Sequence, residues 1–313
     1  MRFSKDILDT EAIDRVQLAQ AWHIRQANFP PLIGFDYPVD TAEISLTGPY
    51  CALNCAHCGR RYLEHMIPIW EASERIDQAP SLLISGGCDG QGRVPVGERA
   101  LRLLHELHPG RRFTWHVGLI DQEGLEPIIP LVDVISFDFV GDDETIREVT
   151  GLDRSVADYV ATYQLLQQHV PVIPHLVIGL RGGELGHERK ALDLLAELGC
   201  EALVFLVLIP TPGTRYADRQ PPAVVDVIHL LVEARLRFPR TPLILGCMRP
   251  HGPYRRVLDP LALRAGLNRI VNPAHGAVKL AQELGLGIRR GNECCVLDMD
   301  SFQPDARLVD VVT

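Results

Sequence analysis

Short apolar runs alternate with longer amphipathic stretches through most of this chain. The apolar runs predict eight strands, over residues 42–46, 82–85, 113–117, 134–139, 172–178, 203–208, 243–246 and 269–271. Helical spacing lies between or after them, as in residues 96–107, 156–168, 187–198, 223–237 and 274–284. Strands that alternate with helices favour a parallel sheet, so the fold class is α/β. Eight such units fit a closed (β/α)8 barrel of the TIM type.

One amphipathic segment precedes this pattern. Residues 9–26 have helical spacing, and Pro30 and Pro31 end the helix. Its expected apolar face consists of Ile13, Val16, Leu18, Ala19 and Trp22. We expect this helix to cap the bottom of the barrel or to pack on its side. The predicted regions are a helical extension over 1–40, a barrel over 41–290 and a cysteine-containing tail over 291–313.

Candidate chemistry is concentrated in the stretch Cys51-Ala-Leu-Asn-Cys55-Ala-His-Cys58, directly after the first predicted strand. Cysteine thiolates hold iron–sulfur clusters, and a cubane with four irons normally takes four of them. Three thiolates therefore leave one iron open to a substrate or cofactor. A zinc knuckle is an alternative, but zinc usually needs a second ligand pair farther along the chain. A disulfide is another, and it requires an oxidising compartment.

Composition limits the function classes. The chain has 313 residues, of which 46% are hydrophobic and 23% charged, as in ordinary globular proteins. Its formal net charge is −9 and it has no basic stripe, so we expect no nucleic-acid partner. No apolar run reaches the length of a membrane span, so no membrane association is expected. Eight cysteines without a signal peptide favour a reducing, cytoplasmic location and metal ligation.

At the three cysteines the chain resembles the radical S-adenosylmethionine (SAM) superfamily. The family signature is CxxxCxxC, usually with a ring-bearing residue before the third cysteine, and here that residue is His57. The resemblance implies a [4Fe–4S] cluster on Cys51, Cys55 and Cys58. SAM would chelate the open iron, and one electron would cleave it to methionine and a 5′-deoxyadenosyl radical.

The resemblance also implies SAM contacts at the ends of other strands. Ser85, Gly86 and Gly87 resemble a GGE-type motif that holds the amino group of SAM, with Cys88 where Glu is common. Asp138 takes the place of a polar residue that binds the ribose. The remaining implied contacts are the adenine contacts of Ile178 and Gly179, a contact from His57, and Pro210 within an I-P-x-P-G-T segment beside the SAM pocket.

Four further cysteines suggest a second, auxiliary iron–sulfur cluster. Cys88 and Cys247 follow strands, and Cys294 and Cys295 lie in the tail. Arg249 is included because biotin synthase has an arginine ligand to its second cluster on a late strand. The alternative is that these thiols are buried small apolar residues. Cys200 precedes a strand at the opposite end of the barrel, and we expect it to lie in the core.

Over about residues 40–296 the chain resembles the biotin-synthase-related group, and within it one component of the two-protein, archaeal-type lipoyl synthase. That resemblance implies sulfur insertion into an octanoyl-lysine chain of a carrier protein or peptide, with the auxiliary cluster as sulfur donor. It also implies a partner synthase component and an electron donor such as ferredoxin or flavodoxin. The alternatives are a methylornithine-synthase-like radical SAM mutase without an auxiliary cluster and an iron–sulfur scaffold or electron carrier.

Overall fold

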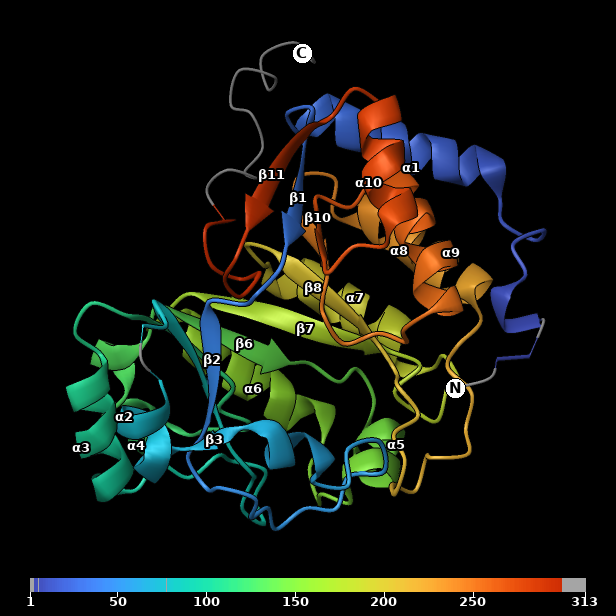
Figure 1. Cartoon of the computed structure of the whole chain (residues 1–313). Helices are drawn as coiled ribbons and strands as arrows, with labels where there is room; N and C mark the ends of the chain where they lie inside the picture. The colour runs from blue at the N-terminus through green and yellow to red at the C-terminus, as the bar shows by residue number, and fades with distance from the viewer. Residues whose placement is uncertain (1–2, 5, 77, 300–313) are drawn as a thin grey trace.

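The computed structural model describes residues 3–4, 6–76 and 78–299, which fold around one curled parallel sheet (Figure 1). Its strands lie in the order β11-β1-β10-β9-β8-β7-β6-β5-β4-β2-β3. The strands are β1 Leu32–Asp36, β2 Thr41–Ser45, β3 Ile67–Pro68, β4 Ser81–Ser85, β5 Arg112–Trp115, β6 Val134–Asp138, β7 Val172–Ile178, β8 Leu203–Val207, β9 Leu243–Leu245, β10 Arg269–Val271 and β11 Gly287–Gly291.

Helices connect these strands and cover the outside of the sheet. The α-helices are α1 Arg15–Asn28, α2 Ala72–Arg75, α3 Glu98–Leu107, α4 Gln122–Leu125, α5 Asp143–Thr145, α6 Val156–Gln167, α7 His187–Leu198, α8 Val224–Arg237, α9 Pro253–Arg264 and α10 His275–Glu283. The short turns of 3-10 or π type are η1 Asp6–Leu8, η2 Arg61–His65, η3 Ile69–Glu71, η4 Ile129–Leu131 and η5 Ile146–Thr150.

The predicted α/β fold is confirmed, since all eight predicted strands and the five helices predicted between or after them are present in the expected order, as is the N-terminal helix α1. The sequence pattern missed β1, which lies inside the predicted helical extension and joins the sheet between β10 and β11. It also missed α9, because Pro253 and Pro260 both read as helix breakers. Pro253 is tolerated because it occupies the first turn, where its missing N–H has no helical acceptor.

The sheet is curled, but among the described residues β10 does not pair directly with β2. Instead, β1 pairs with β10 and β11, whereas β2 pairs with β4 and β3. The C-terminal segment lies along the link between β1 and β2. Tyr37 N donates to Gly291 O at 2.7 Å, and Asp40 N donates to Asn292 O at 2.9 Å. The barrel is therefore a curled half-barrel with a seam that the tail occupies.

Alternating residues give the sheet two apolar faces. The outer face packs against the helices through residues such as Ile44, Phe113 and Phe205, all of which are fully buried. The inner face forms a separate cluster, made of Val134, Ile173, Ala202, Val204, Ile244 and Val271 with the tail residues Cys295, Val296 and Leu297. The tail therefore fills part of the barrel interior with its own side chains.

Helix α1 packs on the side of the barrel, against α8 and α9. Asp14 caps its first turn, because its carboxylate accepts from Val16 N and Gln17 N. The helix buries Leu18, Ala21 and Arg25, which recur at the helical period. The expected apolar face was wrong at Val16, which is 78% exposed, and at Ala19, which is also exposed.

Candidate active site

The three-cysteine loop follows β2 at the C-terminal edge of the sheet and is held by loops from three other strands. Ala52 N donates to Cys88 O at 2.7 Å, which ties the loop to the end of β4. Ala56 N donates to Val149 O at 2.7 Å, after β6, and Tyr216 N donates to Ala56 O at 3.1 Å, after β8. These bonds join segments far apart in sequence, so the loop depends on the whole sheet for its shape.

Backbone N–H groups point at the sulfur atoms of this loop. Cys51 Sγ accepts from the N–H of Cys88 at 3.2 Å and from that of Leu53. At Cys58, burial raises the pKa, and the backbone N–H groups of residues 60, 61 and 62 oppose this. Such donors stabilise negative charge on sulfur and are typical of iron–sulfur sites, where they tune the potential. The loop therefore presents thiols in surroundings that suit thiolate ligands.

The thiols differ in acidity. The hydrogen bond from the Cys88 thiol is the main cause that lowers the pKa of Cys51 to about 6, and the charge of Arg60 acts in the same direction. Burial raises the pKa of Cys55 to about 12, together with the charges of Cys58 and Cys51. Burial also raises the pKa of Cys58. A bound metal would therefore have to displace protons from Cys55 and Cys58.

The donor set fits a cluster better than one ion. Among residues 3–4, 6–76 and 78–299, no three or more His, Cys, Asp or Glu side chains converge to hold a metal ion. A cubane takes one thiolate per iron, so its ligands are spread more widely than those of a single ion. The three thiols, their N–H donors and the nearby cations Arg60 and Arg215 suit such a group.

His57 supplies an unpartnered polar atom beside the thiols. Its Nδ1 is buried and has no hydrogen-bond partner within the described part of the chain. Burial lowers the pKa of the ring to about 4, although the charge of Asp138 opposes this, so the ring is neutral near pH 7. A buried acceptor without a partner is costly, so a ligand at this position would stabilise it. The contact of His57 with SAM stays a prediction.

The Gly86-Gly87 turn after β4 supports the cysteine loop directly. A Cβ on Gly87 would lie 1.9 Å from Tyr50 O and 2.5 Å from Cys51 Cβ, and Gly87 N donates to Thr47 Oγ1 at 2.7 Å. Gly87 is therefore required because the loop lies on its backbone. Contacts of Ser85, Gly86 and Gly87 with SAM stay predictions, and the packing of the loop on Gly87 was not predicted.

Gly87→Ala is expected to displace the loop and to lower the iron content of the reconstituted protein severalfold, because its Cβ cannot coexist with Tyr50 O. Gly90→Ala is the matched control, since a Cβ there meets nothing within 4 Å. Iron analysis and circular dichroism of both variants test this. Full iron content in Gly87→Ala would contradict it.

The loops after β7 and β8 frame the same edge. Ile178 is fully buried in the outer core, so only its backbone is available to a ligand. Gly179 N already donates to Glu188 Oε1 at 2.7 Å, and Gly186 N donates to Glu188 Oε2 at 2.6 Å. Glu188 is 1% exposed, and its role in holding this turn was not predicted. Its position in the first turn of α7 was the only signal.

The I-P-x-P-G-T segment lies beside the cysteine loop, as expected. Thr211 Oγ1 lies 3.0 Å from Tyr62 Oη, and a Cβ on Gly59 would lie 3.1 Å from Thr214 Cγ2. Pro210, which directly precedes Thr211, is buried. The segment thus forms one wall of the site, while the contact of Pro210 with SAM stays a prediction.

Asp138 and His116 form a polar pair at the ends of β6 and β5. His116 Nδ1 lies 3.5 Å from Asp138 Oδ2, and the Asp138 side chain is 60% exposed, so it is reachable from solvent. Burial alone would lower the pKa of His116, but the hydrogen bond and charge of Asp138 outweigh it and raise that pKa. Likewise, the protein around the Asp138 carboxylate opposes its ionisation although the side chain reaches solvent, but the hydrogen bond and charge of His116 lower its pKa overall. Each group of the pair therefore favours the charged form of the other.

Asp138→Asn is expected to lower the pKa of His116 below its ordinary value, because burial then acts without the compensating carboxylate. His116 would lose its proton at a lower pH than in the wild type. An NMR titration of the histidine ring protons measures this. Asp121→Asn is the control, since Asp121 pairs with Arg93 instead. An unchanged titration of His116 in Asp138→Asn would refute the pairing.

The extra cysteines divide into two groups, and the auxiliary cluster, expected on three of the four with Cys88 the least certain ligand, stays a prediction. Cys88 is hydrogen-bonded to Cys51 and so belongs to the first loop. Cys294 and Cys295 lie in the cluster on the inner face of the sheet, and the charge of Cys294 adds to burial in raising the pKa of Cys247 to about 11. The neighbouring thiols Cys294 and Cys295 are also hydrogen-bonded to each other.

Arg249 does not stand free beside these thiols, and its predicted role as a cluster ligand would require it to leave a buried ion pair. Its Nε and Nη2 donate to the two carboxylate oxygens of Asp259 at 2.9 and 2.8 Å, and Nη1 donates to Gly246 O at 2.6 Å. Both charged side chains are fully buried. The Arg249 guanidinium therefore forms a buried ion pair with Asp259 inside the fold.

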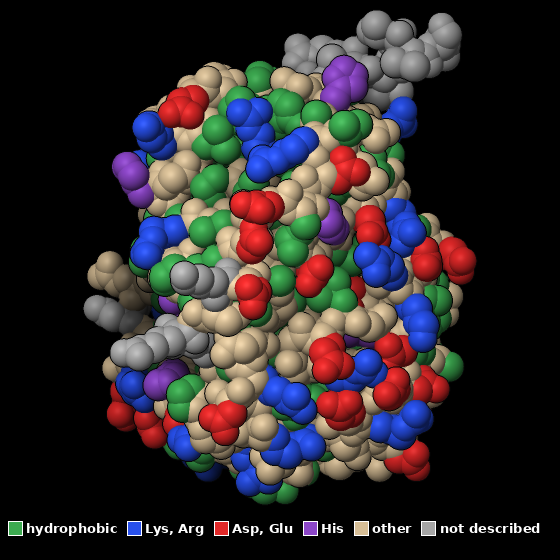
Figure 2. Space-filling view, turned by 90° about the vertical axis from the view of Figure 1, so that its right-hand side faces the viewer, with side chains coloured by type: hydrophobic (Ala, Val, Ile, Leu, Met, Phe, Trp, Pro, Cys, Tyr) green, Lys and Arg blue, Asp and Glu red, His purple; other side chains and the backbone are tan. Residues whose placement is uncertain are grey.

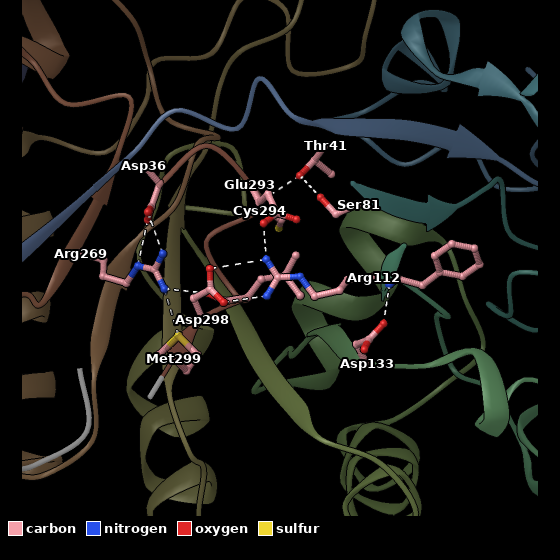
Figure 3. Close-up of polar contacts among 12 residues, drawn as sticks. Asp36, Thr41, Ser81, Arg112, Asp133, Arg269, Glu293, Cys294, Asp298 and Met299 are labelled. Carbon is pink, nitrogen blue, oxygen red and sulfur yellow. Dashed lines mark hydrogen bonds and ion pairs between the residues drawn. The ribbon is translucent and has the colours of Figure 1, made fainter. Parts of the chain in front are cut away.

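Two arginines hold the tail in the barrel (Figure 3). Arg112 on β5 pairs with Glu293 and, at 2.6 Å, with Asp298. Arg269 on β10 donates to both oxygens of Asp36 and to Leu297 O at 2.9 Å. Cys294 N also donates to Thr41 Oγ1 at 2.9 Å. These contacts fix the tail thiols inside the sheet, and residues beyond 299 lie outside the described part.

Acidic and basic side chains are interspersed on the face shown in Figure 2, so this face has no large patch of one charge. None of the described helices is both long and apolar enough to cross a membrane. Two surface hollows, of about 450 and 420 Å³, lie away from the cysteine loop, one between α1, α9 and α10 and the other beside α7 and α8.

No family model and no curated protein sequence matches this chain. Solved structures are similar in fold. Methylornithine synthase (PylB) has a TM-score of 0.63 at 14% identity, covering 91% of this chain and 92% of its own. The FeFe-hydrogenase maturase HydG from Carboxydothermus hydrogenoformans has a TM-score of 0.65 at 16% identity, covering 90% and 73%. SuiB from Streptococcus suis, bound to S-adenosylmethionine, has a TM-score of 0.52 at 13% identity, covering 75% and 58%.

Proposed function

We propose that this protein is a radical SAM enzyme. One observation carries the proposal: three thiols in a C-x3-C-x2-C loop, met by backbone N–H donors, lie at the C-terminal edge of a parallel half-barrel. Ligand sites in such sheets form at that edge. The fold is shared with the structure of SuiB bound to S-adenosylmethionine. With a [4Fe–4S] cluster and SAM bound, the site would supply a 5′-deoxyadenosyl radical that takes hydrogen from a C–H bond.

The surrounding residues would bind and orient SAM. Cys51, Cys55 and Cys58 would hold the cluster, and the backbone at Ser85–Gly87 would receive the amino group. The carboxylate of Asp138 is solvent-accessible and could accept from ribose hydroxyls, with His116 holding it ionised. Backbone atoms of Ile178 and Gly179 and the wall at Pro210 would border the adenine. The buried ring of His57 would help exclude water beside the thiols.

We further propose sulfur insertion into a protein-bound octanoyl-lysine chain. The support is the second thiol group, Cys247, Cys294 and Cys295, which could hold an auxiliary cluster as sulfur donor. The partners would be an octanoylated carrier protein or peptide, a second synthase component, and an electron donor such as ferredoxin or flavodoxin. Such an enzyme would work where thiols stay reduced.

A second candidate is a radical SAM mutase that acts on a small molecule without an auxiliary cluster. It is favoured by the likeness to methylornithine synthase, which extends over 91% of this chain and 92% of that protein. The identity of 14% leaves the substrate open, because such a likeness supports the fold alone.

One experiment tests the proposed function and separates the two candidates. The reconstituted protein is incubated anaerobically with SAM, a reductant and an octanoyl-lysine peptide, with and without a partner synthase, and analysed by mass spectrometry. Release of 5′-deoxyadenosine supports the radical SAM assignment, and its absence would refute it. A thiolated peptide supports sulfur insertion. SAM cleavage without any thiolated product favours the mutase.

Cys247→Ala is expected to lose about four irons, the content of one cubane cluster. It should still cleave SAM, because the first loop is intact, but it should insert no sulfur. Iron analysis and peptide mass spectrometry measure these outcomes. Cys247 is the informative choice because it alone of this thiol group is exposed. Normal iron content and normal thiolated product would rule out an auxiliary cluster here.

A further inference from the structure

A fourth thiol lies at the three-cysteine loop. Cys88 follows Gly87 at the end of β4, and its thiol is hydrogen-bonded to that of Cys51. The hydrogen bond to Cys51, burial and the charges of Cys51, Cys55 and Asp138 all raise the pKa of the Cys88 thiol. The loop and β4 thus bring together four cysteines, of which three belong to the C-x3-C-x2-C spacing.

The position of Cys88 is fixed by its backbone. Its N–H donates to Cys51 Sγ at 3.2 Å, and its carbonyl accepts from Ala52 N at 2.7 Å. The preceding Gly87 packs directly on Tyr50 and Cys51. Because both contacts involve its backbone, the main chain of Cys88 cannot move away without moving that loop, whereas its side chain is free to rotate. Its closeness to Cys51 is therefore built into the fold.

This arrangement differs from that of a cysteine used only for packing. Cys200 is also half-buried against the core, and burial raises the pKa of its thiol to about 12. No thiol of the described chain is hydrogen-bonded to Cys200, whereas Cys88 has a thiol partner and two backbone bonds to the loop. Packing alone explains Cys200 but leaves these directed contacts of Cys88 unexplained.

We propose that Cys88 is the fourth protein ligand of the cluster when SAM is absent, and that SAM displaces it. The inference rests on the proposed function. The Cys88 thiol gives up its proton to solvent when its sulfur binds the open iron. When SAM arrives, its amino nitrogen and carboxylate oxygen bind that iron, the Fe–S bond to Cys88 breaks, and the thiolate takes a proton from solvent. No electron is transferred in the exchange.

A consequence is that Cys88 protects the resting site. An iron without a protein ligand is the one most readily lost on oxidation, which leaves a three-iron cluster. A fourth thiolate occupies that coordination position until SAM replaces it. Because Cys88 already adjoins Cys51, the exchange requires rotation of one side chain rather than movement of a loop.

The test compares wild-type protein, Cys88→Ala and the control Cys200→Ala, each carrying its reconstituted cluster. Mild ferricyanide oxidation without SAM, followed by EPR quantification of three-iron clusters, should give severalfold more signal from Cys88→Ala than from the other two. With saturating SAM the three proteins should give equal signals. In the wild type, anaerobic alkylation of Cys88, followed by peptide mass spectrometry, should increase severalfold on addition of SAM.

Equal three-iron signals without SAM, or equal alkylation of Cys88 with and without SAM, would overturn the ligand role. A Cys51–Cys88 disulfide in the cluster-loaded protein would overturn it as well. Failure of the proposed function looks different, because wild-type protein would then contain no more iron than Cys55→Ala. Circular dichroism of Cys88→Ala establishes that the variant is folded.

Discussion

Cys55→Ala is expected to abolish both cluster binding and reductive cleavage of SAM. Cys55 lies at the centre of the loop, and the charges of both Cys51 and Cys58 act on it. The substitution leaves a second iron without its loop thiolate, and Cys88 adjoins Cys51 and cannot take the place of Cys55, so the cluster would be lost. Iron and sulfide analysis together with assay of 5′-deoxyadenosine measure the effect.

The choice of Cys55 matters for this experiment. Cys88 adjoins Cys51 and could replace it as a ligand, whereas the described residues place no such hydrogen-bonded thiol beside Cys55. Replacement of Cys51 or Cys58 should also abolish SAM cleavage, with Cys51→Ala the variant in which some iron could persist. Cys200→Ala is the control and should retain iron and activity. Wild-type SAM cleavage by Cys55→Ala would refute the radical SAM assignment.

Arg249→Met is expected to lower the free energy of unfolding by about 3–5 kcal/mol, the usual cost of removing one member of a buried ion pair. The substitution leaves the Asp259 carboxylate buried, with Ala274 N as its remaining donor at 2.8 Å. The free energy would be measured by urea denaturation of the metal-free chain, so that cluster loss does not contribute.

Two controls make this prediction specific. Arg189→Met breaks the exposed pair with Glu233 and should cost at most about 1 kcal/mol. Arg249→Met combined with Asp259→Leu should recover part of the stability, because no unpaired charge then remains in the interior. If Arg249 ligated a cluster instead, its replacement would remove iron and leave the stability of the metal-free chain near that of the wild type.

The sequence predicted most of the framework because hydrophobic periodicity is a local property. All eight predicted strands and the five helices predicted between or after them are in place, with ends shifted by a few residues. The pattern did not show β1, because its five residues lie between Pro31 and Pro38 and give too short a run. It did not show α9, because a proline within the helix carries the opposite local signal.

The sequence by itself determined the three-thiol motif, because Cys51, Cys55 and Cys58 lie within one short loop and their spacing is a property of the chain. Only the tertiary structure decided how the other chemistry divides. Cys88 joins Cys51 across 37 residues of chain, and Cys294 reaches Thr41 across 253. Arg249 forms a buried ion pair with Asp259, and Glu188 accepts a hydrogen bond from Gly179 N. Residue type reveals what a side chain can do, but its partner is set by the curvature of the sheet, which brings distant strand ends together.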